Sequence, residues 1–216
     1  MTDPAHVLSV NVGGVRTIDV GDRTITTGIW KQPVAGRVAV RGVNVHGDDQ
    51  ADRTVHGGYD KAVYAYARED TDWWEAELGR ALQHGNFGEN LTTAGIDLTA
   101  CVIGERWHAG STVLEVSEPR FPCFKLGIRM GDPGFLKRFA AARRPGTYLR
   151  IVEEGELGAG DPILVRDRPD HGVTIALFAE AYLGDHALAD KLLEAPVSDS
   201  WREWAERQVE RVAGQR

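Results

Sequence analysis

The sequence is poor in cysteine and in long apolar runs. Its 216 residues include only two cysteines, Cys101 and Cys123, too few for the disulfide framework that holds small secreted domains together. No apolar run approaches the ~20 residues of a membrane-spanning helix, and residues 1–12 lack the basic start and apolar segment of a secretory signal. We therefore expect a cytoplasmic protein with free thiols and no membrane partner.

Several common ligand-binding motifs are also missing. The chain has neither a Gly-x-x-x-x-Gly-Lys phosphate loop nor a Gly-x-Gly-x-x-Gly after a predicted strand, so the usual nucleotide sites have no support. The histidines lie at spacings that match no zinc site, and two cysteines cannot complete a thiolate-rich one. The acidic segment 44–52 lacks the regular oxygen spacing and final glutamate of a calcium loop. A candidate ligand must be of another kind.

A surplus of basic residues is lacking as well. The formal net charge of -7 disfavours broad nucleic-acid binding, which needs Lys and Arg in excess on one face. One segment departs from this average, because Asp132 is the only acid between Pro119 and Arg150. An anionic ligand would suit this segment, although the arginines within residues 134–144 are equally expected on the solvated face of a helix. The basic residues of the segment are Arg120, Lys125, Arg129, Lys137, Arg138, Arg143, Arg144 and Arg150.

Short β-rich runs separated by glycines fill the chain before His171. Their residue types and spacing favour a β-barrel or a strongly bent sheet, with one surface helix over residues 70–78. The tail has apolar residues at helical spacing in three short segments. We predict a β-barrel domain over residues 1–170 and a three-helix domain over residues 171–216. The predicted strands are residues 7–12, 23–27, 37–45, 61–66, 105–108, 112–117, 148–153 and 162–166, and the tail helices are 173–183, 187–193 and 200–212.

The strongest chemical signal is Cys123, which follows Pro122 and lies between Arg120 and Lys125. A thiol acts as a nucleophile or metal ligand in its thiolate form, and neighbouring cations favour that form. Pro122 fixes its own φ and restricts the residue before it, so the chain reaches the cysteine along a path with few alternatives. Cys101 has apolar neighbours instead, and for it we expect simple burial.

Two further segments have both a functional and a structural interpretation. Gly57 and Gly58 allow a positive φ or a close approach to a ligand, and they would present His56 beside it. The same residues could simply form a turn next to a solvated histidine. Glu89 and Asn90 could supply a carboxylate and an amide to a pocket, or could form a polar turn before a strand.

Five segments, in order along the chain, carry a resemblance to a known family. They are residues 27–31, 47–52, 56–64, 86–91 and 118–123. Each is weak alone, but their combination is specific. Together they resemble the MOSC domain family, named after the C-terminal part of molybdenum cofactor sulfurases, and within it the stand-alone bacterial YiiM-like branch. The helical tail resembles the three-helix extension of that branch.

The resemblance implies a MOSC-type β-barrel that binds the molybdenum cofactor, Mo-molybdopterin. It implies that Cys123 is the molybdenum ligand, and His56 is our choice of proton donor. Thiolates suit soft metal centres, and Arg120 and Lys125 would offset the charge of an anionic cofactor. The residues expected around the cofactor are Thr27, Lys31, His56, Gly57, Gly58, Asp60, Glu89, Asn90, Arg120 and Lys125, with Asp52 as a further polar group.

The implied activity is two-electron reduction of small N-hydroxylated substrates, such as hydroxylaminopurines or amidoximes, to amines or amidines and water. A partner reductase would supply the electrons, and the biological role would be detoxification of N-hydroxylated bases. Two alternatives stay open: a carrier of cofactor or of persulfide sulfur on Cys123, and a metal-free cysteine enzyme with His56 as base. Trp201 and Trp204 could dock the tail on its own barrel or form a homodimer.

Overall fold

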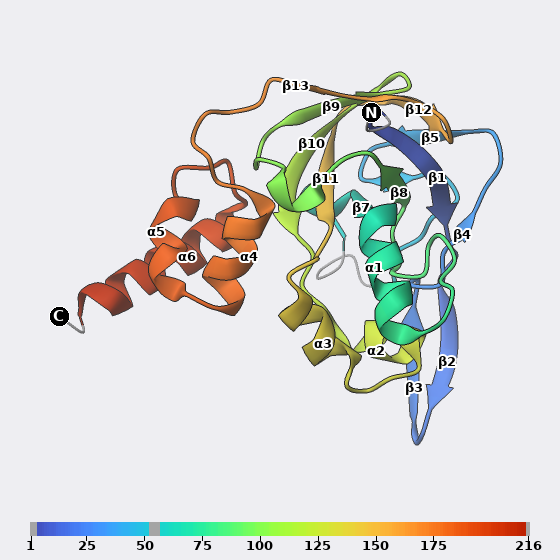
Figure 1. Cartoon of the computed structure of the whole chain (residues 1–216), viewed down its shortest axis with the longest axis horizontal. Coiled ribbons are helices and arrows are strands. Elements are labelled where there is room, and N and C mark those ends of the chain that lie inside the picture. The colour runs from blue at the N-terminus through green and yellow to red at the C-terminus, as the bar shows by residue number, and fades with distance from the viewer. Residues whose placement is uncertain (1–3, 52–56, 215–216) are drawn as a thin grey trace.

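The computed structural model describes residues 4–51 and 57–214, and its largest element is a sheet of eight strands (Figure 1). The chain is therefore mainly β with helices, as the sequence predicts. The strands have a buried face and consist largely of Val, Ile, Leu and Thr, which fit a pleated, half-buried surface. In sheet order they are β13 (Ile163–Arg166), β9 (Arg106–Ala109), β10 (Thr112–Pro119), β11 (Thr147–Glu153), β7 (Val63–Ala67), β8 (Leu91–Ala94), β1 (His6–Val12) and β4 (Gln32–Pro33).

The sheet bends until its two sides meet, but it is not a continuously closed barrel. His6 of β1 forms one isolated antiparallel bridge with Pro162, beside β13. Hydrogen bonds from Val7 N to the Asp161 carbonyl (2.9 Å) and from Ile163 N to the Ala5 carbonyl (2.8 Å) flank this bridge. Proline has no N–H to donate, so a regular ladder does not extend through this position. Of the two predicted forms, a barrel or a strongly bent sheet, the structure has the strongly bent sheet, with bridged ends and without full closure.

Two smaller sheets complete the β structure. One contains β12 (Gly155–Gly158), β5 (Arg37–Arg41) and β6 (Asn44–Val45), and the other is the hairpin of β2 (Arg16–Val20) and β3 (Arg23–Thr27). The hairpin extends away from the main sheet, at the lower right of Figure 1. Its outer residues are exposed, but β3 ends at the buried Thr27. The loop that follows β3 therefore starts at a buried position beside the main sheet.

Three helices and the sheet enclose an aromatic cluster. The helices are α1 (Arg68–Leu78), α2 (Phe124–Met130) and α3 (Phe135–Ala142). Trp74 of α1 packs against Phe135 and Phe139 of α3, with ring centroids 4.8 and 6.1 Å apart, and its indole N–H donates to the Tyr66 hydroxyl at 2.9 Å. Buried aromatic side chains bring a large apolar area to such a cluster. Leu126 and Met130 of α2 are buried in the same cluster.

The tail folds into helices that lie together on one side of the sheet (Figure 1). They are α4 (Ile175–Leu183), η3 (His186–Leu188), α5 (Ala189–Leu192) and α6 (Asp199–Ala213), and η2 (Leu98–Ala100) packs near α4. Ile175 and Phe178 are fully buried in one hydrophobic core with the sheet strands. The division into domains at residues 170 and 171 stays a prediction. No helix in the described ranges is long and apolar enough to cross a membrane.

Candidate functional site

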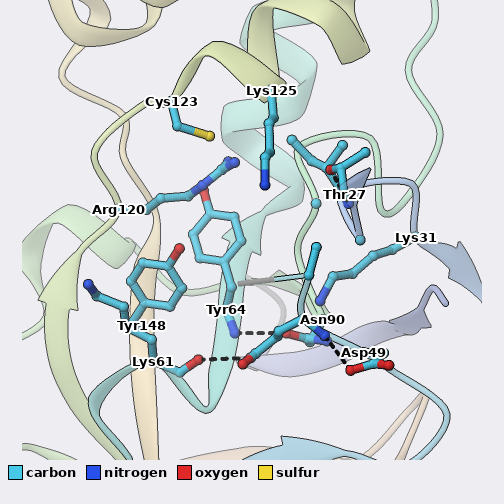
Figure 2. A pocket seen from close by; sticks show the side chains of 15 residues that line it. Thr27, Lys31, Asp49, Lys61, Tyr64, Asn90, Arg120, Cys123, Lys125 and Tyr148 are labelled. Carbon is cyan, nitrogen blue, oxygen red and sulfur yellow. Dashed lines mark hydrogen bonds between the residues drawn. The ribbon is translucent and has the colours of Figure 1, made fainter. Parts of the chain in front are cut away.

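A pocket opens where several loops meet at one end of the sheet (Figure 2). The loop after β3, the loop before β7, the turn before β8 and the loop before α2 all contribute to it, together with side chains of β7 and β11. Six of the predicted site residues line this pocket, namely Thr27, Lys31, Asn90, Arg120, Cys123 and Lys125. The other lining residues are Gly28, Ile29, Asp49, Gln50, Ala51, Lys61, Tyr64, Gly88 and Tyr148.

Cys123 lies immediately before α2 and is a free, half-buried thiol. Figure 2 shows its sulfur directed to the space that Arg120 and Lys125 also enter. The neighbouring Phe121 is packed against the tail, with its ring 4.4 Å from that of Tyr182. Cys101, in contrast, is buried, and burial raises the pKa of its thiol. Simple burial of Cys101 is therefore confirmed, and the accessible sulfur of the described chain is that of Cys123.

Arg120 forms the buried cationic wall of the pocket. Its guanidinium donates to the Phe87 carbonyl at 2.6 Å and lies 4.8 Å from the centre of the Tyr64 ring. Burial alone would lower the pKa of Arg120, but Tyr64, Tyr148 and Cys123 outweigh this effect and raise it, so the side chain stays charged. Within the described residues no carboxylate forms an ion pair with it. A buried cation without a protein counter-ion favours an anionic ligand.

The floor of the pocket is a buried polar network. Lys31 Nζ lies 2.6 Å from Asp48 Oδ2, which also accepts from Asn90 Nδ2 at 2.9 Å. Asn90 Oδ1 in turn accepts from the Tyr64 backbone N–H at 3.1 Å. Burial lowers the pKa of Lys31, and Asp48 opposes that shift. The acidic segment that matched a calcium loop poorly thus supplies an anchor for two pocket residues.

Two tyrosines of the pocket were not predicted from the sequence. Tyr64 of β7 and Tyr148 of β11 are directly paired in the antiparallel register, and their ring centroids are 5.2 Å apart. Burial raises the pKa of Tyr148 to about 12 and also raises the pKa of Tyr64. Both hydroxyls stay protonated at neutral pH, and the hydroxyl of Tyr64 donates to the Pro145 carbonyl at 2.8 Å. Nothing in the local sequence distinguishes them from core aromatics, because only the strand register brings them to the pocket.

Close backbone packing holds the loops around the pocket. A Cβ atom added to Gly28 would lie 2.3 Å from the Asp49 carbonyl oxygen, far inside a normal contact distance. Gly88 has a φ of +78°, and an added Cβ would lie 2.8 Å from Ile29 Cγ1. Glycine permits both contacts because it has no side chain. The loop after β3 can therefore pack directly on its two neighbours.

The other predicted site residues do not line the pocket in the described structure. The Asp60 carboxylate accepts from Arg150 Nε at 2.7 Å. Glu89 lies beneath the turn before β8, where it accepts from the Gly85 and Phe87 N–H groups at 2.5 and 3.0 Å, and burial raises its pKa. Asp60 therefore forms an ion pair with Arg150 of β11, and Glu89 holds the backbone of the turn before β8. Gly57 and Gly58 precede η1 (Tyr59–Lys61), and Gly58 has the positive φ of 90° that favours glycine, whereas His56 and Asp52 lie outside the described residues.

A larger groove of about 530 Å³ lies beside α1 and the end of α3. Its charged side chains already have partners: Arg144 Nη1 lies 2.5 Å from Asp70 Oδ1, and Arg143 Nε lies 2.9 Å from Glu180 Oε2. The groove contains no cysteine or histidine. In the described ranges there is no group of three or more His, Cys, Asp or Glu that could hold a metal ion alone. The thiol pocket is therefore the stronger candidate site.

Comparison with known proteins places this fold and pocket in a family. The profile of the MOSC domain matches residues 52–164. The chain belongs to the MOSC domain family, and the resemblance seen in the sequence is confirmed. Within the family it is YiiM-like, because the crystal structure of YiiM from Geobacillus stearothermophilus superposes with a TM-score of 0.79 at 30% sequence identity, covering 95% of this chain and 99% of that chain.

Two curated relatives extend the comparison. The uncharacterized protein YflK of Bacillus subtilis (strain 168) is 36% identical over 200 residues, which covers 91% of this chain and 90% of that protein. A protein named "Reductase" from Gibberella moniliformis (strain M3125 / FGSC 7600) is 36% identical over 170 residues, which covers 77% of this chain but only 30% of that protein. The match with the fungal protein is therefore a match with one part of a longer chain.

Proposed function

We propose that this protein is a molybdenum-cofactor-dependent reductase of N-hydroxylated compounds, with Cys123 as the molybdenum ligand. The observation that carries the proposal is one accessible thiol in a pocket with four cationic side chains. Lys31 and Lys61 pair with Asp48 and Glu118, whereas Arg120 has no carboxylate partner among the described residues. The cations are Lys31, Lys61, Arg120 and Lys125. The name of the fungal relative supports a reductive activity.

The pocket residues fit such a cofactor in their chemistry. A thiolate is a good ligand for a soft metal centre, and the anionic phosphate of the cofactor needs cations and hydroxyl donors. Arg120 is buried without a carboxylate partner within the described residues, and Thr27 lies at the same pocket. The enclosed volume is about 80 Å³. Since ligand sites commonly measure roughly 300–1,000 Å³, the described residues would surround one end of the cofactor.

The proposed reaction converts R–NHOH, two electrons and two protons into R–NH₂ and water. The cofactor would supply the two-electron redox chemistry, with electrons from a separate reductase. Cys123 would hold the metal, and Arg120, Lys125, Lys31 and Thr27 would bind and orient the anionic part. A proton must reach the oxygen that leaves nitrogen, and His56 stays our proposed donor on the basis of its ordinary pKa range.

Cys123→Ser and Cys101→Ala, expressed in a host that makes the cofactor, test the proposal. Turnover of a hydroxylaminopurine would be measured with a reduced viologen dye as electron donor, so that no partner protein is needed. Wild type and Cys101→Ala should contain molybdenum and turn over, whereas Cys123→Ser should lose at least about a hundredfold in kcat, because a lost metal ligand removes transition-state stabilisation. X-ray absorption should show one fewer sulfur in the metal shell of Cys123→Ser.

Three results would contradict the proposal. Full turnover by metal-loaded Cys123→Ser would remove this thiol from the reaction. A persulfide on Cys123 in protein that contains no molybdenum, detected by mass spectrometry, would favour a sulfur carrier. Activity of molybdenum-free protein that is lost on alkylation of Cys123 would favour a cysteine enzyme.

A further inference from the structure

The helical tail reaches the pocket through a chain of polar contacts. Trp201 of α6 donates from its indole N–H to Glu118 Oε2 at 3.0 Å. The other oxygen of Glu118 lies 3.4 Å from the ammonium of Lys61, which lines the pocket. Glu118 is buried and belongs to β10, directly before the loop of Cys123. The Glu118 carboxylate thus connects Trp201 of the tail with Lys61 of the pocket, at the start of the loop that carries Cys123.

A second contact between the tail and the sheet leads to the same short helix. The Pro196 carbonyl, in the loop before α6, accepts from Arg150 Nη2 at 2.9 Å. Arg150 also donates to Asp60 Oδ1 at 2.7 Å and to Glu115 Oε1 at 2.9 Å. Asp60 and Lys61 are neighbours in η1. Both polar routes from the tail therefore end on adjacent residues beside the pocket.

A third contact is apolar and acts on the cysteine loop itself. Phe121, two residues before Cys123, has its ring centroid 4.4 Å from that of Tyr182, 5.4 Å from Trp201 and 6.3 Å from Phe178. Aromatic pairs at such distances stabilise their mutual arrangement beyond simple burial. Pro122 leaves the chain little freedom between this packed ring and the thiol. The tail therefore fixes the end of the loop from which Cys123 extends.

From these contacts we infer that the C-terminal helices are a working part of the site, and that Trp201 is a positioning residue acting on Cys123 through Phe121 and on Lys61 through Glu118. The inference deepens the proposed function, on which it rests for the role of the thiol. In this inference the tail adds the ring contacts with Phe121 and the hydrogen bond to Glu118 to the contacts that the sheet already makes with the cysteine loop and η1.

Two substitutions on the same helix separate positioning from general stability. Trp201→Phe keeps an aromatic ring beside Phe121 but removes the donor to Glu118. Trp204→Phe is the matched control, because Trp204 packs on Tyr182, His186 and Trp201 and, among the described residues, makes no ring contact with Phe121 and no hydrogen bond to Glu118. Both variants are made in the full chain, and thermal unfolding checks that each is folded.

The first measurement is the rate of alkylation of Cys123 by iodoacetamide in the folded, cofactor-free protein, where the buried Cys101 serves as an internal reference. Trp201→Phe should raise this rate at least about threefold, because a loop held less firmly opens more often. In the loaded enzyme its kcat should fall about tenfold, since small misplacement of a reacting group has large kinetic effects. Trp204→Phe should change either value less than about twofold.

Glu118→Leu provides the decisive comparison, because it removes both the acceptor for the Trp201 indole and the ion pair with Lys61. If Trp201 acts through Glu118, the double variant should be no worse than about twofold below the poorer single variant. Equal effects of the Trp201 and Trp204 variants, or fully additive effects of Trp201→Phe and Glu118→Leu, would overturn the inference. If wild type shows neither molybdenum nor turnover, the proposed function fails, while the alkylation rates still decide whether the tail positions the loop.

Discussion

Asp48 is the buried acceptor on which several elements of the pocket meet. Its side chain has no exposed surface, and one carboxylate oxygen accepts from Lys31 at 2.6 Å and from Asn90 at 2.9 Å. The other oxygen accepts from the backbone N–H of Gly13 at 2.9 Å. Asp48→Asn preserves the volume of the side chain but removes its charge. We expect a large loss of stability, because the ammonium of Lys31 then stays buried without its counter-ion.

The size of this loss follows from the burial of the pair. Removing one partner of a buried ion pair costs about 3–5 kcal/mol. Lys31 keeps 9% of its side chain exposed, so we expect the lower limit, about 3 kcal/mol. For a chain of this length that corresponds to a fall in Tm of roughly 6–12 °C.

The same substitution should change the dependence of stability on pH. The folded pKa of Lys31 is already below its ordinary value of 10.5, so the folded state binds fewer protons than the unfolded state between the two values. Without Asp48, which opposes this shift, the pKa of Lys31 should fall further. The stability deficit of Asp48→Asn should therefore shrink as the pH rises from 7 toward 10.

Urea unfolding of wild type, Asp48→Asn, Lys31→Met and the double variant, at pH 7 and pH 9, measures both effects. The double variant should recover at least about 1 kcal/mol relative to the sum of the single losses, because it contains no unpaired buried charge. A coupling energy below about 0.5 kcal/mol, or a deficit that widens at pH 9, would refute this reasoning.

Two further substitutions test the support of the pocket loops. Glu89→Gln should cost about 1–3 kcal/mol in urea unfolding at pH 7, because its amide would face the Phe87 N–H donor. Burial raises the pKa of Glu89 above its ordinary value of 4.5, so this side chain stabilises the folded state most below pH 4.5 and less as the pH rises through its folded pKa. If Glu89→Gln lost less stability at pH 4 than at pH 7, this reasoning would be contradicted. Gly28→Ala should lower the stability by about 1–3 kcal/mol, because its Cβ would overpack against the Asp49 carbonyl. Gly14→Ala is the control: its Cβ meets nothing within 4 Å, so urea unfolding should show a change of less than about 0.5 kcal/mol.

Much of the fold was predictable because local signals and tertiary structure agree. The predicted strand 23–27 is β3, and the predicted helical segments of the tail correspond to α4, α5 and α6 within a few residues. The predicted strand 37–45 divides into β5 and β6, because Gly42 turns the chain with a φ of +60°. The strand β12, Gly155–Gly158, was missed because glycine at both ends gives it little intrinsic strand preference.

The site was predictable only where its chemistry is local in sequence. Cys123, Arg120 and Lys125 lie within one short loop, so their convergence follows from the sequence itself. The pairing of Tyr64 with Tyr148 depends on strand register across 84 positions, which no local pattern reveals. Asp60 and Glu89 have the residue types of a binding site, but tertiary contacts with Arg150 and with backbone N–H groups give their carboxylates structural partners instead.

The order of strands in the sheet has a consequence for synthesis of the protein. β1 is synthesised before its main partner β8, with Val10 opposite Leu91. At a translation rate of about 5–20 residues per second, roughly 4–16 s pass between the synthesis of β1 and that of β8. A nascent chain halted before β8 would present this apolar strand without a neighbour, and we expect such chains to depend on chaperones until translation resumes.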